Sequence, residues 1–265
     1  MTRIIAHRGF SGKYPENTLL AVKRAVDIGA DWVEVDARLS KDNQFVLMHD
    51  KKLNRTTNGK GRVSGKTFQN IKKFQIKKRN LSIPSLEEVL EVINKNRPKI
   101  NIEIKTWRAA LPLVKLIKRH KIKNKVVVSS GSITALKIVR NETPSLKTAY
   151  LFFNSNYPKW DYFATSIAKL SFKLTHFMIL FVAKSAEVDF VNISYPFATK
   201  RFIKKLHKRG YKVNVWTVNT KALMKKLIKR KVDGIITDHP DKLKKLLKKK
   251  PKPRRRLIRL RRRKR

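Results

Sequence analysis

Short apolar runs rich in β-branched and aromatic residues alternate along the chain with segments in which apolar residues recur every three to four positions. The first pattern is typical of buried strands and the second of amphipathic helices. Strands are predicted at residues 3–6, 32–35, 45–48, 100–104, 126–129, 148–152, 190–193, 213–218 and 234–237. Helices are predicted at residues 18–28, 85–94, 111–120, 133–140, 200–208, 221–230 and 241–249, with one or two more between residues 160 and 186.

This alternation of strands and helices predicts a parallel sheet covered by helices. Nine strands are one more than a closed eight-stranded barrel needs. Only about nine residues separate Val35 from Phe45, whereas a crossover between parallel strands takes a dozen or more. The turn-forming Lys41-Asp42-Asn43 therefore predicts a β-hairpin excursion, and the other eight strands predict a (β/α)8 TIM barrel domain over residues 1–249.

Two segments do not follow the alternation. Residues 51–80 have little periodicity and are predicted to form a small insertion after the excursion. Within them, Gly59 to Thr67 resembles a phosphate-binding P-loop, but its spacing is one residue too long and no clear strand precedes it, so no nucleotide site is expected. Residues 250–265 combine prolines with closely spaced arginines, which predicts a disordered, basic, low-complexity tail.

The charge of the chain adds an expectation about partners. Lys and Arg number 65 against 18 Asp and Glu, for a formal net charge of +47. Residues 242–265 hold 16 of these cations and no acid, so most of the excess lies outside the tail. Such a charge predicts attraction to phosphates, nucleic acid or an anionic membrane. A lysine-rich composition that fills solvated helix faces explains it equally well, and both interpretations stay open.

Composition also excludes several kinds of site. The chain has no cysteine, which rules out disulfides, thiolate metal sites and cysteine nucleophiles. Its first apolar run is too short for a secretory signal, and its longest, residues 177–183, is far below the ~20 residues of a membrane span. We expect a cytoplasmic protein, which the tail could place peripherally at the inner membrane surface.

Carboxylates gather at the predicted strand ends, where TIM barrels place their functional groups. Glu34 and Asp36 are two positions apart and therefore point to the same side of one strand, and Glu103 lies on the next barrel strand. Three carboxylates at one barrel mouth predict a hard divalent cation, Mg²⁺ or Ca²⁺. The alternative is a set of ion pairs with Arg8 and Lys105.

Two of the six histidines, His7 and His49, fall at the same ends. Imidazole titrates near neutral pH, so such a pair can share proton transfer at a phosphodiester, and we predict that both are catalytic. Arg8 and Lys105 are predicted to contact the phosphate. The substrate pocket is assigned Glu16 and Trp216, although a strand tryptophan equally serves the core.

These residues together resemble the glycerophosphodiester phosphodiesterase family. The resemblance runs from about residue 3 to residue 245 and is weakest at residues 150–190. Its motifs are His7-Arg8-Gly9, Pro15-Glu16-Asn17-Thr18, Glu34-Val35-Asp36, His49-Asp50, Ile102-Glu103-Ile104-Lys105, Val215-Trp216-Thr217-Val218-Asn219 and Gly234-Ile235-Ile236-Thr237-Asp238.

The resemblance implies a barrel of the phospholipase-C-like type with one divalent cation held by Glu34, Asp36 and Glu103. It implies that His7 and His49 are the acid–base pair, and that the reaction releases sn-glycerol 3-phosphate and an alcohol from a glycerophosphodiester.

Two other functions stay open on the sequence. The first is a lysophospholipase D-like phosphodiesterase acting on membrane lysophospholipids, which the basic tail would favour. The second is a polyanion-binding protein acting through its basic surface. The chain has no zinc-finger spacing, RNA-binding strand motif or helix-turn-helix signal. We therefore expect only non-specific, salt-sensitive nucleic acid binding.

Overall fold

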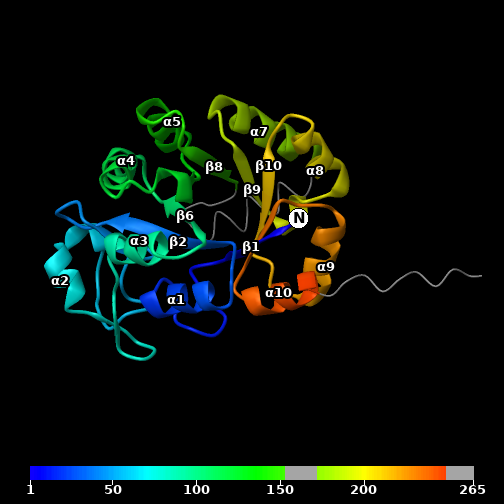
Figure 1. Cartoon of the computed structure of the whole chain (residues 1–265). Coiled ribbons are helices and arrows are strands. Elements are labelled where there is room, and N and C mark those ends of the chain that lie inside the picture. The colour runs from blue at the N-terminus through cyan, green and yellow to red at the C-terminus, as the bar shows by residue number, and fades with distance from the viewer. Residues whose placement is uncertain (153–171, 249–265) are drawn as a thin grey trace, which may run out of the picture.

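A computed structural model of the chain describes residues 1–152 and 172–248. Eight parallel strands close into a barrel because β1 pairs with both β11 and β2. Helices cover the barrel on its outside (Figure 1), so the TIM barrel prediction is confirmed. The barrel strands are β1 (Arg3–Ala6), β2 (Trp32–Leu39), β6 (Lys99–Ile104), β7 (Val126–Ser130), β8 (Lys147–Leu151), β9 (Phe190–Ser194), β10 (Lys212–Trp216) and β11 (Gly234–Thr237).

The ninth predicted strand forms the expected hairpin. β3 (Phe45–Leu47) lies outside the barrel and pairs antiparallel with the end of β2, with Ala37 opposite Leu47. β2 runs to Leu39, four residues past its predicted end, because its first part pairs with β6 while its last residues pair with β3. The hairpin carries the chain back toward the barrel mouth.

The helices alternate with the strands as the sequence pattern predicts. Several begin after a Ser or Thr whose hydroxyl accepts a hydrogen bond from the first helical turn, which stabilises the helix start. Of the helices predicted between residues 160 and 186, the described residues include α7, and the tail prediction lies outside them. The helices are α1 (Leu19–Asp27), α2 (Phe68–Lys72), α3 (Leu86–Asn94), α4 (Ala110–Arg119), α5 (Ile133–Glu142), α7 (Phe172–Ser185), α8 (Lys200–His207), α9 (Lys221–Lys229) and α10 (Pro240–Lys248).

The barrel interior is apolar at one level and polar at the next. Ile5, Trp32, Val127, Phe190 and Ile236 form a buried cluster inside the barrel. Two or more positions further along their strands, the inward-facing residues become amides, hydroxyls and carboxylates. This change places a polar layer above an apolar plug, at the carboxyl ends of the strands where a site is expected.

Residues 51–80, with the flanking residues 46–50 and 81–83, form a small unit with its own apolar core. It contains α2 and a two-stranded hairpin of β4 (Gln75–Ile76) and β5 (Leu81–Ser82). The stretch resembling a P-loop contains a single 3-10 turn, Val63–Gly65. Seven buried residues pack into one cluster here, which the weak periodicity did not reveal: Val46, Met48, Leu53, Val63, Ile71, Ile76 and Ile83.

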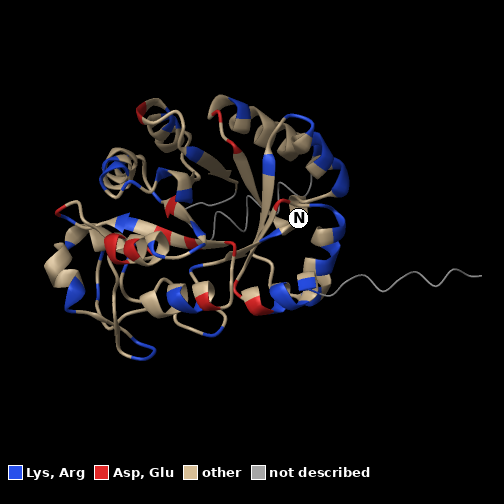
Figure 2. Ribbon diagram, viewed as in Figure 1, with Lys and Arg blue, Asp and Glu red and all other residues tan. Residues whose placement is uncertain are grey.

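Positive charge is spread over the outer helices. Figure 2 shows Lys and Arg along α8, α9 and α10, so the basic surface extends well before the tail. Across the described ranges 1–152 and 172–248, no helix has both the length and the apolar character needed to cross a membrane.

Candidate active site

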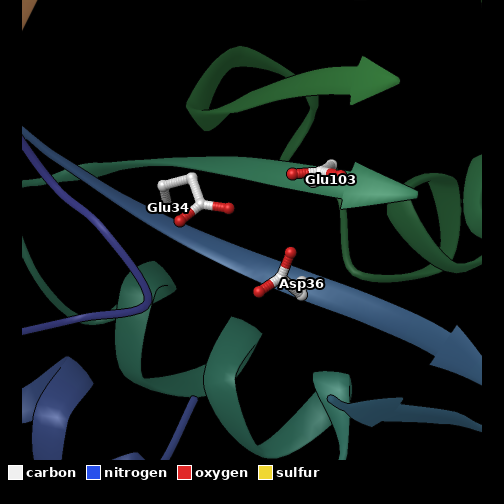
Figure 3. Close-up of side chains that lie close together, drawn as sticks. All are labelled: Glu34, Asp36 and Glu103. Carbon is white, nitrogen blue, oxygen red and sulfur yellow. The ribbon is translucent and has the colours of Figure 1, made fainter. Parts of the chain in front are cut away.

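Three predicted ligands come together through strand pairing. Glu34 and Asp36 lie on β2, and the register of β2 and β6 places Asp36 directly beside Glu103. All three side chains are buried, and one carboxylate oxygen from each lies within 4.8 Å of the others. Figure 3 shows the three carboxylates turned toward one another above the two strands.

Two cations compensate Asp36. The Lys105 ammonium lies 2.5 Å from Asp36 Oδ1 and also contacts Glu103, while Arg8 Nε lies 3.1 Å from Asp36 Oδ2. The Asn17 side chain donates a further hydrogen bond of 2.9 Å to Oδ2. Burial alone would raise the pKa of Asp36, but the charges of Lys105 and Arg8 hold it well below its usual range. Part of the ion-pair alternative is therefore present in the structure.

Glu34 is not compensated in the same way. Its Oε2 accepts a hydrogen bond of 2.8 Å from the Arg8 backbone, but its buried Oε1 accepts none from the described part of the chain. Burial, followed by the negative charge of Asp36, raises the pKa of Glu34 to about 7. A buried carboxylate with an unused oxygen in an all-oxygen cluster fits a hard divalent cation.

Both predicted histidines are anchored through Nδ1. His7 Nδ1 lies 2.6 Å from Asp238 Oδ1, and His49 Nδ1 lies 2.7 Å from Asp50 Oδ1. Burial would raise the pKa of Asp238, but its hydrogen bond with His7 lowers it, and the hydrogen bond of His49 lowers the pKa of Asp50. An ionised carboxylate only accepts, so Nδ1 of each ring donates to its aspartate and Nε2 is the atom that faces away from it.

The two rings line one cavity of about 70 Å³ at the barrel mouth, together with Arg8, Glu34 and Glu103. Three polar residues of the barrel interior, Asn101, Ser129 and Asn192, also line it, and each has a buried polar atom without a hydrogen-bond partner among the described residues. Such atoms are suited to hydrogen-bond a hydroxylated ligand.

The remaining predicted residues occupy different positions. Trp216 lines this cavity, donates from Nε1 to the Asn192 carbonyl at 3.3 Å and packs against the apolar plug, a position that fits both of the interpretations considered for it. The Lys105 side chain is only 4% exposed, and its ammonium lies beside two carboxylates. Glu16 accepts hydrogen bonds from Arg8 at 2.9 Å and from Arg55 at 2.6 Å, and it lines a neighbouring cavity instead.

The sequence analysis assigned no role to the groups that hold the histidines. Asp238 follows β11 directly, so the strand-end rule could have identified it; Asn219 and Ser11 donate to it at 2.6 and 2.9 Å. Arg55 donates to Asp50 at 2.7 Å from within the insertion, where no signal marked it. Asn17 combines a left-handed backbone, with φ of 55°, and hydrogen bonds to Asp36, a position that an Asn tolerates well.

Comparison with known proteins identifies the family. The sequence profile of the glycerophosphoryl diester phosphodiesterase family matches residues 7–242. A glycerophosphodiester phosphodiesterase of Caldanaerobacter subterraneus subsp. tengcongensis is 36% identical over 259 residues, which cover 94% of this chain and 98% of that protein. 

Solved structures agree with this assignment. A glycerophosphodiester phosphodiesterase of Thermotoga maritima has a TM-score of 0.73 and 29% identity, covering 93% of this chain and 99% of that one. A phosphodiesterase of Oleispira antarctica, in complex with the product sn-glycerol-3-phosphate, has a TM-score of 0.79 and 25% identity, covering 94% and 98%. The chain belongs to the glycerophosphoryl diester phosphodiesterase family and is a phosphoric diester hydrolase.

Proposed function

We propose that this chain hydrolyses glycerophosphodiesters to sn-glycerol 3-phosphate and an alcohol, in a metal-dependent reaction with His7 and His49 as acid and base. One observation carries the proposal. Two histidines with Nδ1 anchored on carboxylates line the same cavity as Glu34, a buried acid with an unpartnered oxygen. The product complex of the Oleispira antarctica relative supports glycerol 3-phosphate as the product.

The histidines move the protons. With Nδ1 donating to an aspartate, the Nε2 of one ring accepts a proton from the attacking hydroxyl group or water. The other ring, in its protonated form, donates its Nε2 proton to the departing alkoxide oxygen. The two rings exchange protonation states over the reaction, which suits side chains that titrate near neutral pH.

Glu34, Asp36 and Glu103 would hold the divalent cation, Mg²⁺ or Ca²⁺. When bound, it would supply Lewis acid chemistry and neutralise charge on the phosphate. Arg8 lines the same cavity and would contact the phosphate with its guanidinium. Lys105 lowers the pKa of Asp36 and also contacts Glu103. The sequence analysis predicts that Lys105 contacts the phosphate. The structure supports a second proposal, in which its ammonium group holds the carboxylates that would bind the cation.

The glycerol moiety fits the interior side of the cavity. Asn101, Ser129 and Asn192 would hydrogen-bond its hydroxyl groups, and the Trp216 ring would pack against its carbon chain. Their buried, unpartnered polar atoms favour a polyhydroxy ligand over an acyl chain at this position. 

The test measures glycerol 3-phosphate release from glycerophosphocholine with Mg²⁺, with Ca²⁺ and with a chelator. We expect activity only with a cation, and Glu34→Gln should lower it at least about 100-fold because a ligand is lost. Either cation at saturation should also raise the melting temperature of the wild-type protein, and not that of Glu34→Gln. Full activity after chelation, with no thermal shift, would contradict the metal assignment.

The predictions about the tail and its partners remain to be tested. They are a boundary after residue 249, a disordered tail over residues 250–265, a cytoplasmic protein, and binding to an anionic membrane or nucleic acid. Deletion of residues 251–265, with vesicle and DNA binding measured at two salt concentrations, addresses them. Hydrolysis of vesicle-bound lysophosphatidylcholine faster than glycerophosphocholine would favour the lysophospholipase D-like alternative.

A further inference from the structure

A second cavity of about 390 Å³ lies next to the catalytic one. Residues 11–16, from the loop after β1, form one side of it. Arg55, Thr56 and residues 76–79, from the insertion, form the other. The catalytic cavity is smaller, at about 70 Å³. With the phosphate and its glycerol in the catalytic cavity, as proposed above, the alcohol portion of the substrate extends toward the second cavity.

The second cavity is strongly basic. Five cations line it and only one acid, Glu16. Two of the cations have carboxylate partners, since Lys13 pairs with Asp241 and Arg55 with Glu16 and Asp50. The other three, Lys77, Lys78 and Arg79, make no ion pair with any carboxylate in the parts of the chain that the structure describes.

These three cations are held in place by the hairpin of the insertion. They occupy the loop between β4 and β5, directly after the buried Ile76. Arg79 and Asn80 both have left-handed backbones, with φ of 73° and 47°, as tight hairpin turns require. The Arg79 guanidinium lies 5.4 Å from the centre of the Tyr14 ring, which ties the hairpin to the loop after β1.

One carboxylate separates the two cavities. Glu16 accepts hydrogen bonds both from Arg8, which lines the catalytic cavity, and from Arg55, which lines the basic one. Arg55 also holds Asp50, the partner of His49. A substrate that extends from the phosphate past Glu16 therefore passes on the His49 side of the site, where the histidine is 34% exposed against 18% for His7.

We propose that the basic cavity binds the alcohol portion of the substrate and selects alcohols that carry a negative group, such as a second phosphate. This inference rests on the proposed function. Lys77, Lys78 and Arg79 offer point charges and a planar guanidinium to phosphate oxygens, the chemistry that recognises phosphoryl groups in proteins. Their lack of carboxylate partners leaves the charges of Lys78 and Arg79 available to a ligand, while the Lys77 ammonium donates a hydrogen bond of 2.8 Å to the Asn54 carbonyl.

The experiment compares two substrates that differ by one phosphate, glycerophosphoinositol and glycerophosphoinositol 4-phosphate, with the full chain and a saturating divalent cation. We expect kcat/KM to be about tenfold higher for the phosphorylated substrate, as two partly screened charge pairs would give. The double variant Lys78→Gln/Arg79→Gln should bring the ratio of the two kcat/KM values close to one, because the phosphorylated substrate loses its two charge partners. Lys225→Gln, an exposed change on α9, is the matched control and should keep the wild-type ratio.

A wild-type ratio near one, or a ratio that the double variant does not change, would overturn the proposal. Hydrolysis of neither substrate would instead contradict the proposed function itself. Melting temperatures of the variants show that a changed ratio does not arise from unfolding. Raising the salt concentration should lower the ratio in the wild-type protein, because exposed charges are screened.

Discussion

Both histidines of the site have Nδ1 hydrogen-bonded to an aspartate, but different parts of the molecule hold the two pairs. His7 follows the barrel strand β1, and its partner Asp238 follows the neighbouring strand β11, where Asn219 and Ser11 fix it. His49 follows β3, outside the barrel, and its partner is the next residue, Asp50. The His7 ring thus bonds a residue 231 positions away in the sequence, which the closed barrel brings beside it. The His49 ring bonds the residue that follows it in the sequence.

The two histidines therefore depend on different parts of the chain. Both sides fix the same tautomer, but only the His49 side depends on the insertion, through Arg55. That side also faces the basic cavity. We therefore expect the barrel strands to position the reaction centre, and the excursion and insertion to supply the part of the site that contacts the alcohol.

Removing either ring is the strongest test that the two histidines act as a pair. His7→Ala and His49→Ala should each lower kcat by about 100- to 10,000-fold, because each removes one proton-transfer step. Glycerol 3-phosphate release from the purified variants measures this. The control is His120→Ala at the end of α4, away from the cavity, which should keep full activity. Near-normal turnover in either active-site variant would remove that histidine from the mechanism.

On the His7 side, Oε2 of the buried Glu34 lies 3.9 Å from His7 Nε2. Burial and the charge of Asp36 raise the pKa of Glu34 to about 7 in the folded protein, against about 4.3 in an unfolded chain. Between these values the folded state binds a proton that the unfolded state has lost. The metal-free protein should therefore lose stability as the pH rises from about 4.3 to 7, by roughly a few kcal/mol.

Unfolding of chelator-treated protein at pH 5 and pH 8 measures this effect. Glu34→Gln carries no charge at either pH and should not show the loss. Asp36, whose pKa is lowered, contributes stability that is lost only as the pH falls below its usual value, so it does not act in this window. Parallel pH dependence in the wild type and the variant would contradict the raised pKa of Glu34.

Asp238, the partner of His7, should contribute more to kcat than Asp50, the partner of His49. Asp238→Asn replaces the carboxylate that fixes the His7 tautomer by an amide, which has one accepting oxygen instead of two, and should lower kcat on the order of 100-fold. Asp50→Asn should cost less, roughly tenfold, because His49 is 34% exposed and water can replace the lost acceptor. Measuring kcat against pH for both variants distinguishes tautomer loss from unfolding. Equal losses would mean that the excursion is as rigid as the barrel.

The sequence predicts the barrel side of this comparison much better than the excursion side. Strand ends are recognisable from hydrophobic runs, and their residues meet because parallel strands share one edge, so Glu34, Asp36 and Glu103 could be grouped without coordinates. The hairpin followed from connection length alone, because no crossover fits between Val35 and Phe45.

Side-chain partners could not be predicted in the same way. The register of β2 and β6 decides which carboxylates Lys105 contacts. Because Lys105 lies beside Asp36 and Glu103, Glu34 is the acid whose Oε1 atom has no hydrogen-bond partner among the described residues. Glu16 lines the second cavity, and no signal in the sequence indicated that Arg55 reaches it there from the insertion. The insertion has a core of irregular spacing, which periodicity cannot detect.

Arg55 offers the finest test of the excursion. Its guanidinium joins Asp50 and Glu16, but it is 48% exposed, and exposed ion pairs contribute little. Arg55→Gln should therefore lower kcat only about threefold, because Asp50 loses one hydrogen-bond donor but still accepts from His49. The measurement is kcat and KM for glycerophosphocholine as a function of pH.

Conservative replacement decides how Arg55 acts. Arg55→Lys keeps the charge but reaches one carboxylate instead of two, so it should restore only part of the loss if the bridge positions Asp50. The matched control is Ser11→Ala on the His7 side, where Asn219 still holds Asp238 and kcat should stay near the wild-type value. If Ser11→Ala lowers kcat more than Arg55→Gln does, His7 depends more on its surroundings than His49 does. The contrast between the two sides would then be reversed.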